Sequence, residues 1–239
     1  MGAKSARMNG ARRERPVIIC RVCNPKGGNS QLAWRGGVRE AGGMLESIET
    51  LLQKAEIAHG HMCAGQILGT RMALLGLKGV GIDDPLGADR KRLIVYAEID
   101  RCATDAISLV TGCRLGKRTL KFRDWGKMAA TFVDLASGSG VRVVALENSR
   151  DLAMQLHPEI ENKKQQQMLA YRELGDDRLF KVQRVRVHVA ATELPGTRVD
   201  RKICARCGEG INFGRFEEVG GEKLCVSCAH PELCYWTAE

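Results

Sequence analysis

The chain of 239 residues is long enough for one sizeable domain and one small appendage, and its hydrophobic content of 44% is typical of a globular protein. No apolar run approaches the roughly 20 residues that span a bilayer, and the N-terminus lacks the apolar stretch of a secretory signal. We therefore predict a cytoplasmic protein with no membrane partner. In that reducing compartment, ten cysteines favour metal ligands or reactive thiols over disulfides.

The formal net charge of +9 is concentrated near the N-terminus, where residues 1–40 hold nine lysines and arginines against two glutamates. We interpret residues 1–43 as a basic, glycine-rich arm, a composition more typical of a solvated segment than of a specific nucleic-acid surface. Cys20 and Cys23 in this arm have the spacing of half a zinc site. Metal binding with distant partners, a redox pair and inert thiols all remain open for these two residues.

The predicted core domain, residues 44–199, begins with a helix whose apolar positions recur at helical spacing. These positions are Leu45, Ile48, Leu52 and Ala55. The helix leads to His59, and a second helix is predicted over residues 66–76. Cys63 would then lie near a helix N-terminus, where the partial positive charge of free N–H groups favours thiolate over thiol.

Two histidines and a cysteine fall within five positions, at His59, His61 and Cys63. Imidazole and thiolate are ligands for transition metals, and they are also a common pair of base and nucleophile. This segment is therefore the main candidate site in the core. The alternative is that these side chains only pack against their neighbours or cap a helix.

Alternating apolar residues predict a strand over residues 93–99, followed by a helix from Arg101 to about Val110. Asp100 is the expected N-cap and Gly112 the expected stop of this helix. Cys102 would lie in the first helical turn, which places a second thiol at a second helix start. Cys63, Cys102 and a histidine could then converge on one ion, and metal and helix ends would both lower the pKa of the two thiols.

The remaining core pattern predicts an α+β domain, with a mainly antiparallel sheet and packed helices. Short separations between the strands that follow the second thiol fit antiparallel hairpins. The predicted strands are residues 119–123, 127–135, 141–146 and 180–190, and the predicted helices are residues 149–156 and 162–174.

The C-terminal module, residues 200–239, contains two Cys-x2-Cys pairs separated by 17 residues. The pairs are Cys204 with Cys207 and Cys225 with Cys228. This spacing is typical of a structural zinc site in which four thiolates occupy every coordination position. We therefore predict a zinc-binding module whose ion stabilises a segment too small for a hydrophobic core of its own.

Four motifs in the core, taken in their order and spacing, resemble the family of proteins that are similar to the E-subunit of formylmethanofuran dehydrogenase. The motifs are His59–Gly65, Asp100–Ile107, Thr111–Lys117 and Phe122–Lys127. The resemblance covers roughly residues 45–148, and a similar Cys-rich tail follows at the C-terminus. The family commonly has proline where this chain has Ala64, and an aromatic residue or cysteine where it has Ala58, so a ligand at position 58 is absent here.

The resemblance implies a homodimer with its site near the interface between the two copies, and an association with a molybdenum or tungsten enzyme of one-carbon metabolism. Our first hypothesis is a metal-binding accessory or regulatory protein. His61, Cys63 and Cys102 would hold a second metal ion of unknown identity and leave one position open. His59 would then act as a nearby base or as an alternate ligand.

Two further hypotheses belong to other functional classes. The first is a thiol- or metal-dependent enzyme in which Cys63 is the nucleophile or sulfur carrier, His59 is a base, and Lys117 or Lys127 binds an anion. The second is a zinc-ribbon regulator that binds nucleic acid through its basic arm. The sequence does not decide whether the chain is an enzyme.

Overall fold

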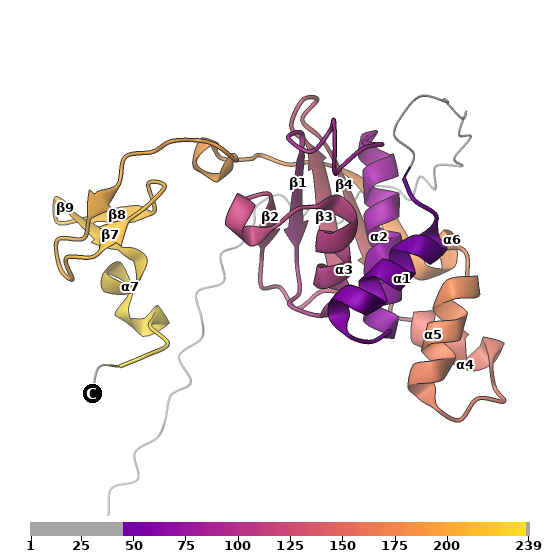
Figure 1. Ribbon diagram of the computed structural model, residues 1–239. Helices are drawn as coiled ribbons and strands as arrows, with labels where there is room; N and C mark the ends of the chain where they lie inside the picture. The colour runs from indigo at the N-terminus through magenta and orange to yellow at the C-terminus, as the bar shows by residue number, and fades with distance from the viewer. Residues whose placement is uncertain (1–44, 238–239) are drawn as a thin grey trace, which may run out of the picture. The chain divides into compact units, whose positions relative to one another are not determined.

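The computed structural model describes residues 45–237 (Figure 1). The predicted arm, with Cys20 and Cys23, lies outside the described residues. The described chain forms a five-stranded sheet with packed helices, followed by two small two-stranded sheets, which confirms the predicted α+β class. Within the described range, no helix is both long and apolar enough to cross a membrane. The proposed domain boundaries stay a prediction.

Three helices carry the candidate core site: α1 (Ile48–His59), α2 (Ala64–Val80) and α3 (Cys102–Thr111). The Ser47 side chain caps α1 by accepting from the backbone N–H of Thr50. Gly112 ends α3 in the left-handed conformation, as predicted. The N-cap of α3 is Arg101 rather than the expected Asp100, and the first turn is stabilised instead by the Thr104 hydroxyl, which donates to the Ile99 carbonyl at 2.6 Å.

The main sheet has the order β2-β1-β3-β4-β5. Its strands are β1 (Leu93–Ala97), β2 (Leu120–Phe122), β3 (Ala129–Asp134), β4 (Ser139–Ala145) and β5 (Phe180–Arg186). Strand β1 pairs with β2 in parallel and with β3 in the antiparallel sense, and the later pairs are antiparallel.

The predicted hairpin between β2 and β3 is wrong, because β1 lies between these two strands. Helix α3 connects β1 to β2, and such a crossover is what a parallel pair requires. The chain after β2 then returns to the opposite side of β1. Its turn is held where the backbone N–H groups of Trp125 and Lys127 both donate to the Glu98 carbonyl, at 3.3 and 3.1 Å.

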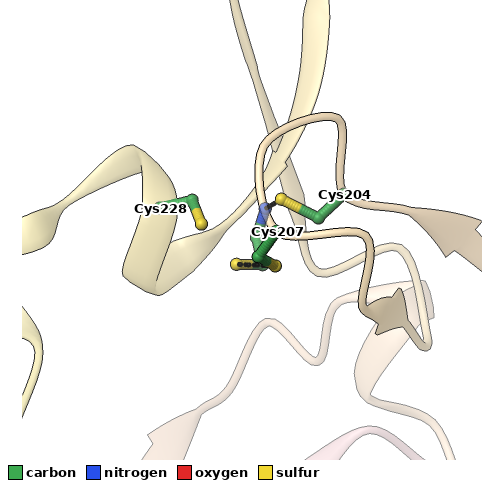
Figure 2. Close-up of side chains that lie close together, drawn as sticks. Cys204, Cys207 and Cys228 are labelled. Carbon is green, nitrogen blue, oxygen red and sulfur yellow. Dashed lines mark hydrogen bonds between the residues drawn. The ribbon is translucent and has the colours of Figure 1, made fainter. Parts of the chain in front are cut away.

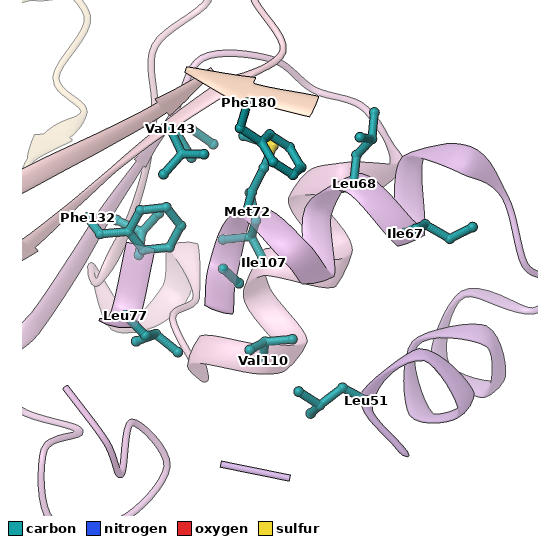
Figure 3. Packing of buried hydrophobic residues seen from close by; sticks show 14 of the residues in the cluster. Leu51, Ile67, Leu68, Met72, Leu77, Ile107, Val110, Phe132, Val143 and Phe180 are labelled. Carbon is teal, nitrogen blue, oxygen red and sulfur yellow. The ribbon is translucent and has the colours of Figure 1, made fainter. Parts of the chain in front are cut away.

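The hydrophobic core lies between α1, α2 and α3 and one face of the sheet (Figure 3). Met72 of α2, Ile107 of α3 and Phe132 of β3 are among its fully enclosed side chains. On the other face, Ile94 and Tyr96 belong to a separate cluster with residues that follow β5. Both faces of β1 are therefore covered, which explains why every residue of this strand is buried.

The remaining helices of the core support α2 from its side. They are α4 (Ser149–Leu156), α5 (Lys163–Glu173) and α6 (Asp176–Leu179). Arg71 of α2 donates to the carbonyls of Tyr171 and Leu174, both at 2.7 Å, and forms an ion pair with Asp176. These bonds satisfy a guanidinium that is almost fully buried, so they fix α2, and with it the residues at its start.

The C-terminal module consists of short strands and one helical turn. These elements are β6 (Lys202–Ile203), β7 (Gly210–Ile211), β8 (Phe216–Val219), β9 (Glu222–Cys225) and α7 (Val226–Ala229). Strand β6 pairs with β7, and β8 pairs with β9. Its buried apolar cluster contains only Cys204, Ile211 and Leu224 among the described residues, so the module lacks a hydrophobic core of ordinary size. Three 3-10 turns complete the described chain: Leu115–Lys117, Ala191–Glu193 and Pro231–Leu233.

Candidate metal centres

The four cysteines of the C-terminal module converge as their spacing predicts. Their sulfur atoms lie within 4.8 Å of one another. Cys204 and Cys207 flank a tight turn in which the Gly208 N–H donates to the Cys204 carbonyl, and Cys228 comes from α7 (Figure 2). Four convergent thiols form the donor set that a structural zinc ion requires.

The electrostatics of this cluster favour a bound cation. Backbone N–H groups of Cys207 and Cys225 lower the pKa of Cys204 to about 6. In contrast, the neighbouring Cys225 side chain, followed by burial, raises the pKa of Cys228 to about 12. Cys204 thus ionises easily, while its surroundings oppose the ionisation of Cys228. A divalent cation removes that opposition and allows all four sulfurs to ionise together.

A second cluster lies in the core and joins His59, Cys63 and Cys102. Their ligand atoms are within 4.8 Å of one another. His59 is the last residue of α1, Cys63 is the N-cap of α2, and Cys102 is the first residue of α3. The two cysteines therefore lie at two helix starts, as the sequence predicts. Three helix ends thus supply one nitrogen and two sulfur donors.

Glycines bring these helix ends together. Gly60 ends α1 with a φ of 89°, which turns the chain back toward Cys63 within three residues. On α2, Gly65 faces α3 so closely that a Cβ there would lie 2.9 Å from the Cβ of Cys102. One turn later, a Cβ on Gly69 would overlap the backbone of Ala103. The absence of side chains at these positions allows the two thiols to approach each other.

Gln66 fixes the second thiol from the same helix. It is fully buried, and its Nε2 donates to the backbone carbonyl of Cys102 at 2.7 Å. This residue was not predicted from the sequence. Its position three residues after Cys63 on a helix was the only available signal, and a glutamine in an apolar stretch does not by itself reveal its partner.

Asp105 orients His59. The Nδ1 of His59 lies 3.1 Å from a carboxylate oxygen of Asp105, which stands on α3 one turn after Cys102. A carboxylate that accepts from one ring nitrogen holds the imidazole so that the other nitrogen can bind a metal. The side chain of His59 is only 17% exposed, so the ring is largely fixed by its surroundings.

His61 is exposed and is not part of the three-residue cluster. Its ring centroid lies 4.8 Å from that of His59. The structure thus brings His59 together with both predicted thiols and leaves His61 at the rim. The predicted assignment of His61 as a ligand and His59 as a neighbouring base stays a prediction, but the geometry favours exchanging the two roles.

The pKa of Cys102 shifts in the direction opposite to that expected at a helix start. Burial, followed by the adjacent Cys63 side chain, raises the pKa of the Cys102 thiol. Desolvation thus outweighs the partial charge of the helix in this thiol. A cation held by both sulfurs would supply the missing stabilisation of the thiolate.

Lys117 precedes β2 in the chain and Lys127 follows it. Lys117 ends the first 3-10 turn and is exposed, while Lys127 precedes β3 and its ammonium lies 5.7 Å from the Trp125 ring centroid. Their proposed role in anion binding stays a prediction. In the C-terminal module, the His230 Nε2 lies 2.8 Å from a Glu217 carboxylate oxygen, so this histidine is engaged outside the four-cysteine cluster.

Fold and sites together define a two-module protein, in which an α+β core with a His/Cys cluster precedes a four-cysteine zinc finger. The family model described as "FmdE, Molybdenum formylmethanofuran dehydrogenase operon" matches residues 58–189. A second model, "Prokaryotic dksA/traR C4-type zinc finger", matches residues 200–232. The chain therefore belongs to the FmdE family and carries a C4-type zinc finger at its C-terminus, which confirms the resemblance found in the sequence.

One curated relative is a "Probable S-adenosyl-L-methionine-binding protein" of Archaeoglobus fulgidus, 33% identical over 125 residues. The match covers 52% of this chain and 33% of the relative, so the chain spans about a third of that protein's length. A crystal structure of an FmdE-like protein from Syntrophus aciditrophicus, named after tungsten formylmethanofuran dehydrogenase, is also similar, with a TM-score of 0.54 and 22% identity. This match covers 79% of this chain and 95% of that one, and it supports the fold alone.

Proposed function

We propose that the core of this FmdE-family protein binds a transition metal through His59, Cys63 and Cys102 and serves as an accessory or regulatory module. The observation that carries the proposal is the convergence of three donor atoms within 4.8 Å from three separate helix ends. The Asp105 carboxylate at His59 supports it, because metal-binding histidines commonly have such a partner on the other ring nitrogen.

The donor set suggests how this centre differs from the zinc finger. One imidazole and two thiolates suit zinc and other borderline or soft ions, and they leave a fourth position for water or a ligand. The four-cysteine site leaves no such position. The core ion is thus suited to exchange or to ligand binding, while the C-terminal zinc has a structural role.

We further propose that the protein acts as a homodimer and alongside a molybdenum or tungsten enzyme of one-carbon metabolism. The name of the family, with its reference to a molybdenum formylmethanofuran dehydrogenase operon, is the support for that association. A nucleic-acid partner is less well supported, because it would depend on the basic arm, residues 1–43, alone. Residues 200–239 hold five lysines and arginines against seven aspartates and glutamates, so the zinc finger offers no excess of positive charge to a phosphate backbone.

A second candidate is a thiol enzyme, which one observation favours. Cys63, His59 and Asp105 are arranged as nucleophile, base and orienting carboxylate, the order of groups in a catalytic triad. This alternative assigns no role to Cys102. A metal site uses both thiols, and for that reason we prefer it.

Metal counting in the full-length protein tests the proposal. We expect two ions per chain in the wild type, and one in Cys63→Ser, Cys102→Ser and His59→Ala, because each variant removes one of only three core ligands. His61→Ala is the matched control and should keep both ions. An unchanged count in all three variants would reject the core metal. The thiol enzyme would then be favoured if iodoacetamide alkylates Cys63 faster than both the buried Cys113 and the partly exposed Cys234.

A further inference from the structure

We infer that Cys63 and Cys102 form a redox-active dithiol, and that their oxidation to a disulfide and the binding of the core metal exclude each other. This inference rests on the proposed function, because it describes how occupancy of the same site would be regulated. It assigns the pair a second chemical state that is reached with a small-molecule disulfide as oxidant.

The geometry places the two sulfurs as neighbours although 38 residues separate them in the sequence. Their Sγ atoms lie within 4.8 Å of each other. A disulfide needs about 2 Å between sulfurs, so side-chain rotation has to close the gap. Gly65 leaves space beside both thiols, since a Cβ built on it would lie 2.9 Å from the Cβ of Cys102 and 3.6 Å from the Cys63 sulfur.

Exposure distinguishes this pair from another thiol of the core. Cys63 and Cys102 are both partly exposed, whereas Cys113 is 2% exposed and packed in the hydrophobic core. A small disulfide can therefore reach either member of the pair but not Cys113. Access and a neighbouring resolving thiol both favour reversible oxidation of a cysteine.

The reaction proceeds by two exchanges. One thiolate of the pair attacks the small disulfide, forming a mixed disulfide and releasing one small thiol. The second thiolate then attacks the protein sulfur of that mixed disulfide and releases the other small thiol. Two electrons pass from the protein to the oxidant. In the metal-free protein, the two thiol hydrogens end on the two small thiols.

Metal binding opposes this reaction because it uses the same sulfur electron pairs. A divalent ion held by His59, Cys63 and Cys102 would lose two of its three protein ligands when the sulfurs join. With metal present, the reaction takes up two protons and releases the ion. Oxidation thus empties the core site, and reduction restores it.

Peptide mapping of the full chain tests the bond. Metal-loaded protein is treated with oxidised glutathione, the remaining thiols are blocked with N-ethylmaleimide, and the chain is digested with trypsin. We expect peptide 55–71 to be joined to peptide 102–114, a link that disappears on reduction. Because peptide 102–114 contains both Cys102 and Cys113, fragment ions must assign the bond to Cys102. The link should be absent from Cys102→Ser.

Metal release is measured in the same samples. We expect oxidation of the wild type to release one ion per chain more than oxidation of Cys102→Ser. This variant is the control, because any ion that it releases comes from the zinc finger. Reduction and added zinc should restore the core ion. A protein that holds the core ion when reduced but forms no link after treatment with oxidised glutathione would overturn the inference while leaving the proposed function intact. A linked protein that keeps the ion, or one that links but never binds a core ion, would equally overturn the coupling, and the last result would also reject the proposed function.

Discussion

Replacing Gly69 by alanine tests whether close helix packing assembles the core site. Gly69 lies on α2 where this helix meets the start of α3. A Cβ built there lies 2.7 Å from the Cα of Ala103 and closer still to its carbonyl oxygen. These are backbone atoms, which cannot rotate aside as a flexible side chain would. The two helices must therefore move apart, and this movement separates Cys63 from Cys102.

The expected size follows from two opposing effects. Forcing an extra methyl group into a packed contact costs about 1–3 kcal/mol, and a backbone contact lies at the upper end of that range. Alanine in place of glycine inside a helix recovers about 1 kcal/mol. The variant should therefore lose about 1–2 kcal/mol of the free energy of unfolding. For a chain of this length that corresponds to a fall of roughly 2–8 °C in melting temperature.

Chemical denaturation and metal counting provide the assay for Gly69→Ala. Gly116→Ala is the matched control, because a Cβ there meets no atom within 4 Å and the residue has no positive φ. We expect the control to keep its stability within about 0.5 kcal/mol and to keep both ions. Gly69→Ala should lose stability and bind the core ion more weakly. A Gly69→Ala protein as stable as the wild type, with full core metal, would refute the packing argument.

Three further predictions concern charge and the zinc finger. Burial alone would raise the pKa of Asp134, but hydrogen bonds from Arg92 and the following turn outweigh it and lower the pKa to about 2. About 2 kcal/mol of the free energy of unfolding should thus be present above pH 3.8 and lost as the pH falls toward 2. The free energy of unfolding of Asp134→Asn, measured across the same pH range, should not show this loss. Chelation of zinc, or Cys204→Ser, should make residues 200–239 protease-sensitive while the helical circular dichroism of the core persists; a resistant tail would contradict the zinc assignment. The Glu217 carboxylate raises the pKa of His230. The contribution of this pair to stability should therefore be complete below pH 6.5 and disappear as the pH rises through the raised pKa of His230. Proteolysis measured against pH should show a weaker dependence in Glu217→Gln.

Local patterns in the sequence predicted most elements of the fold. The helix over 149–156 has the predicted bounds, and the second Cys-x2-Cys pair of the zinc finger needed only spacing to be recognised. These features depend on residues close together in the chain. The parallel pairing of β1 with β2 was not predicted, because it depends on where α3 packs rather than on the strand residues themselves. A short connection such as 123–128 fits a hairpin equally well.

The choice between His59 and His61 was also beyond the sequence. Both residues flank Gly60, and either could reach a metal from a loop. His59 is the last residue of α1 and lies beside α3, where the Asp105 carboxylate accepts from its ring, whereas His61 follows the turn at Gly60. That partner is 46 residues away in the chain, so only the folded structure ranks the two histidines.

The two metal centres differ in net charge, and this difference bears on what each can do. Four thiolates around a divalent zinc ion leave a net charge of −2, which repels a further anionic ligand and suits a closed structural site. One neutral imidazole and two thiolates balance the charge of a divalent ion. In the proposed core site, a water in the fourth position would therefore leave the centre neutral, and a single anion would leave it less negative than the four-thiolate zinc site. An exchangeable role for the core ion thus follows from the same donor count that leaves its coordination open.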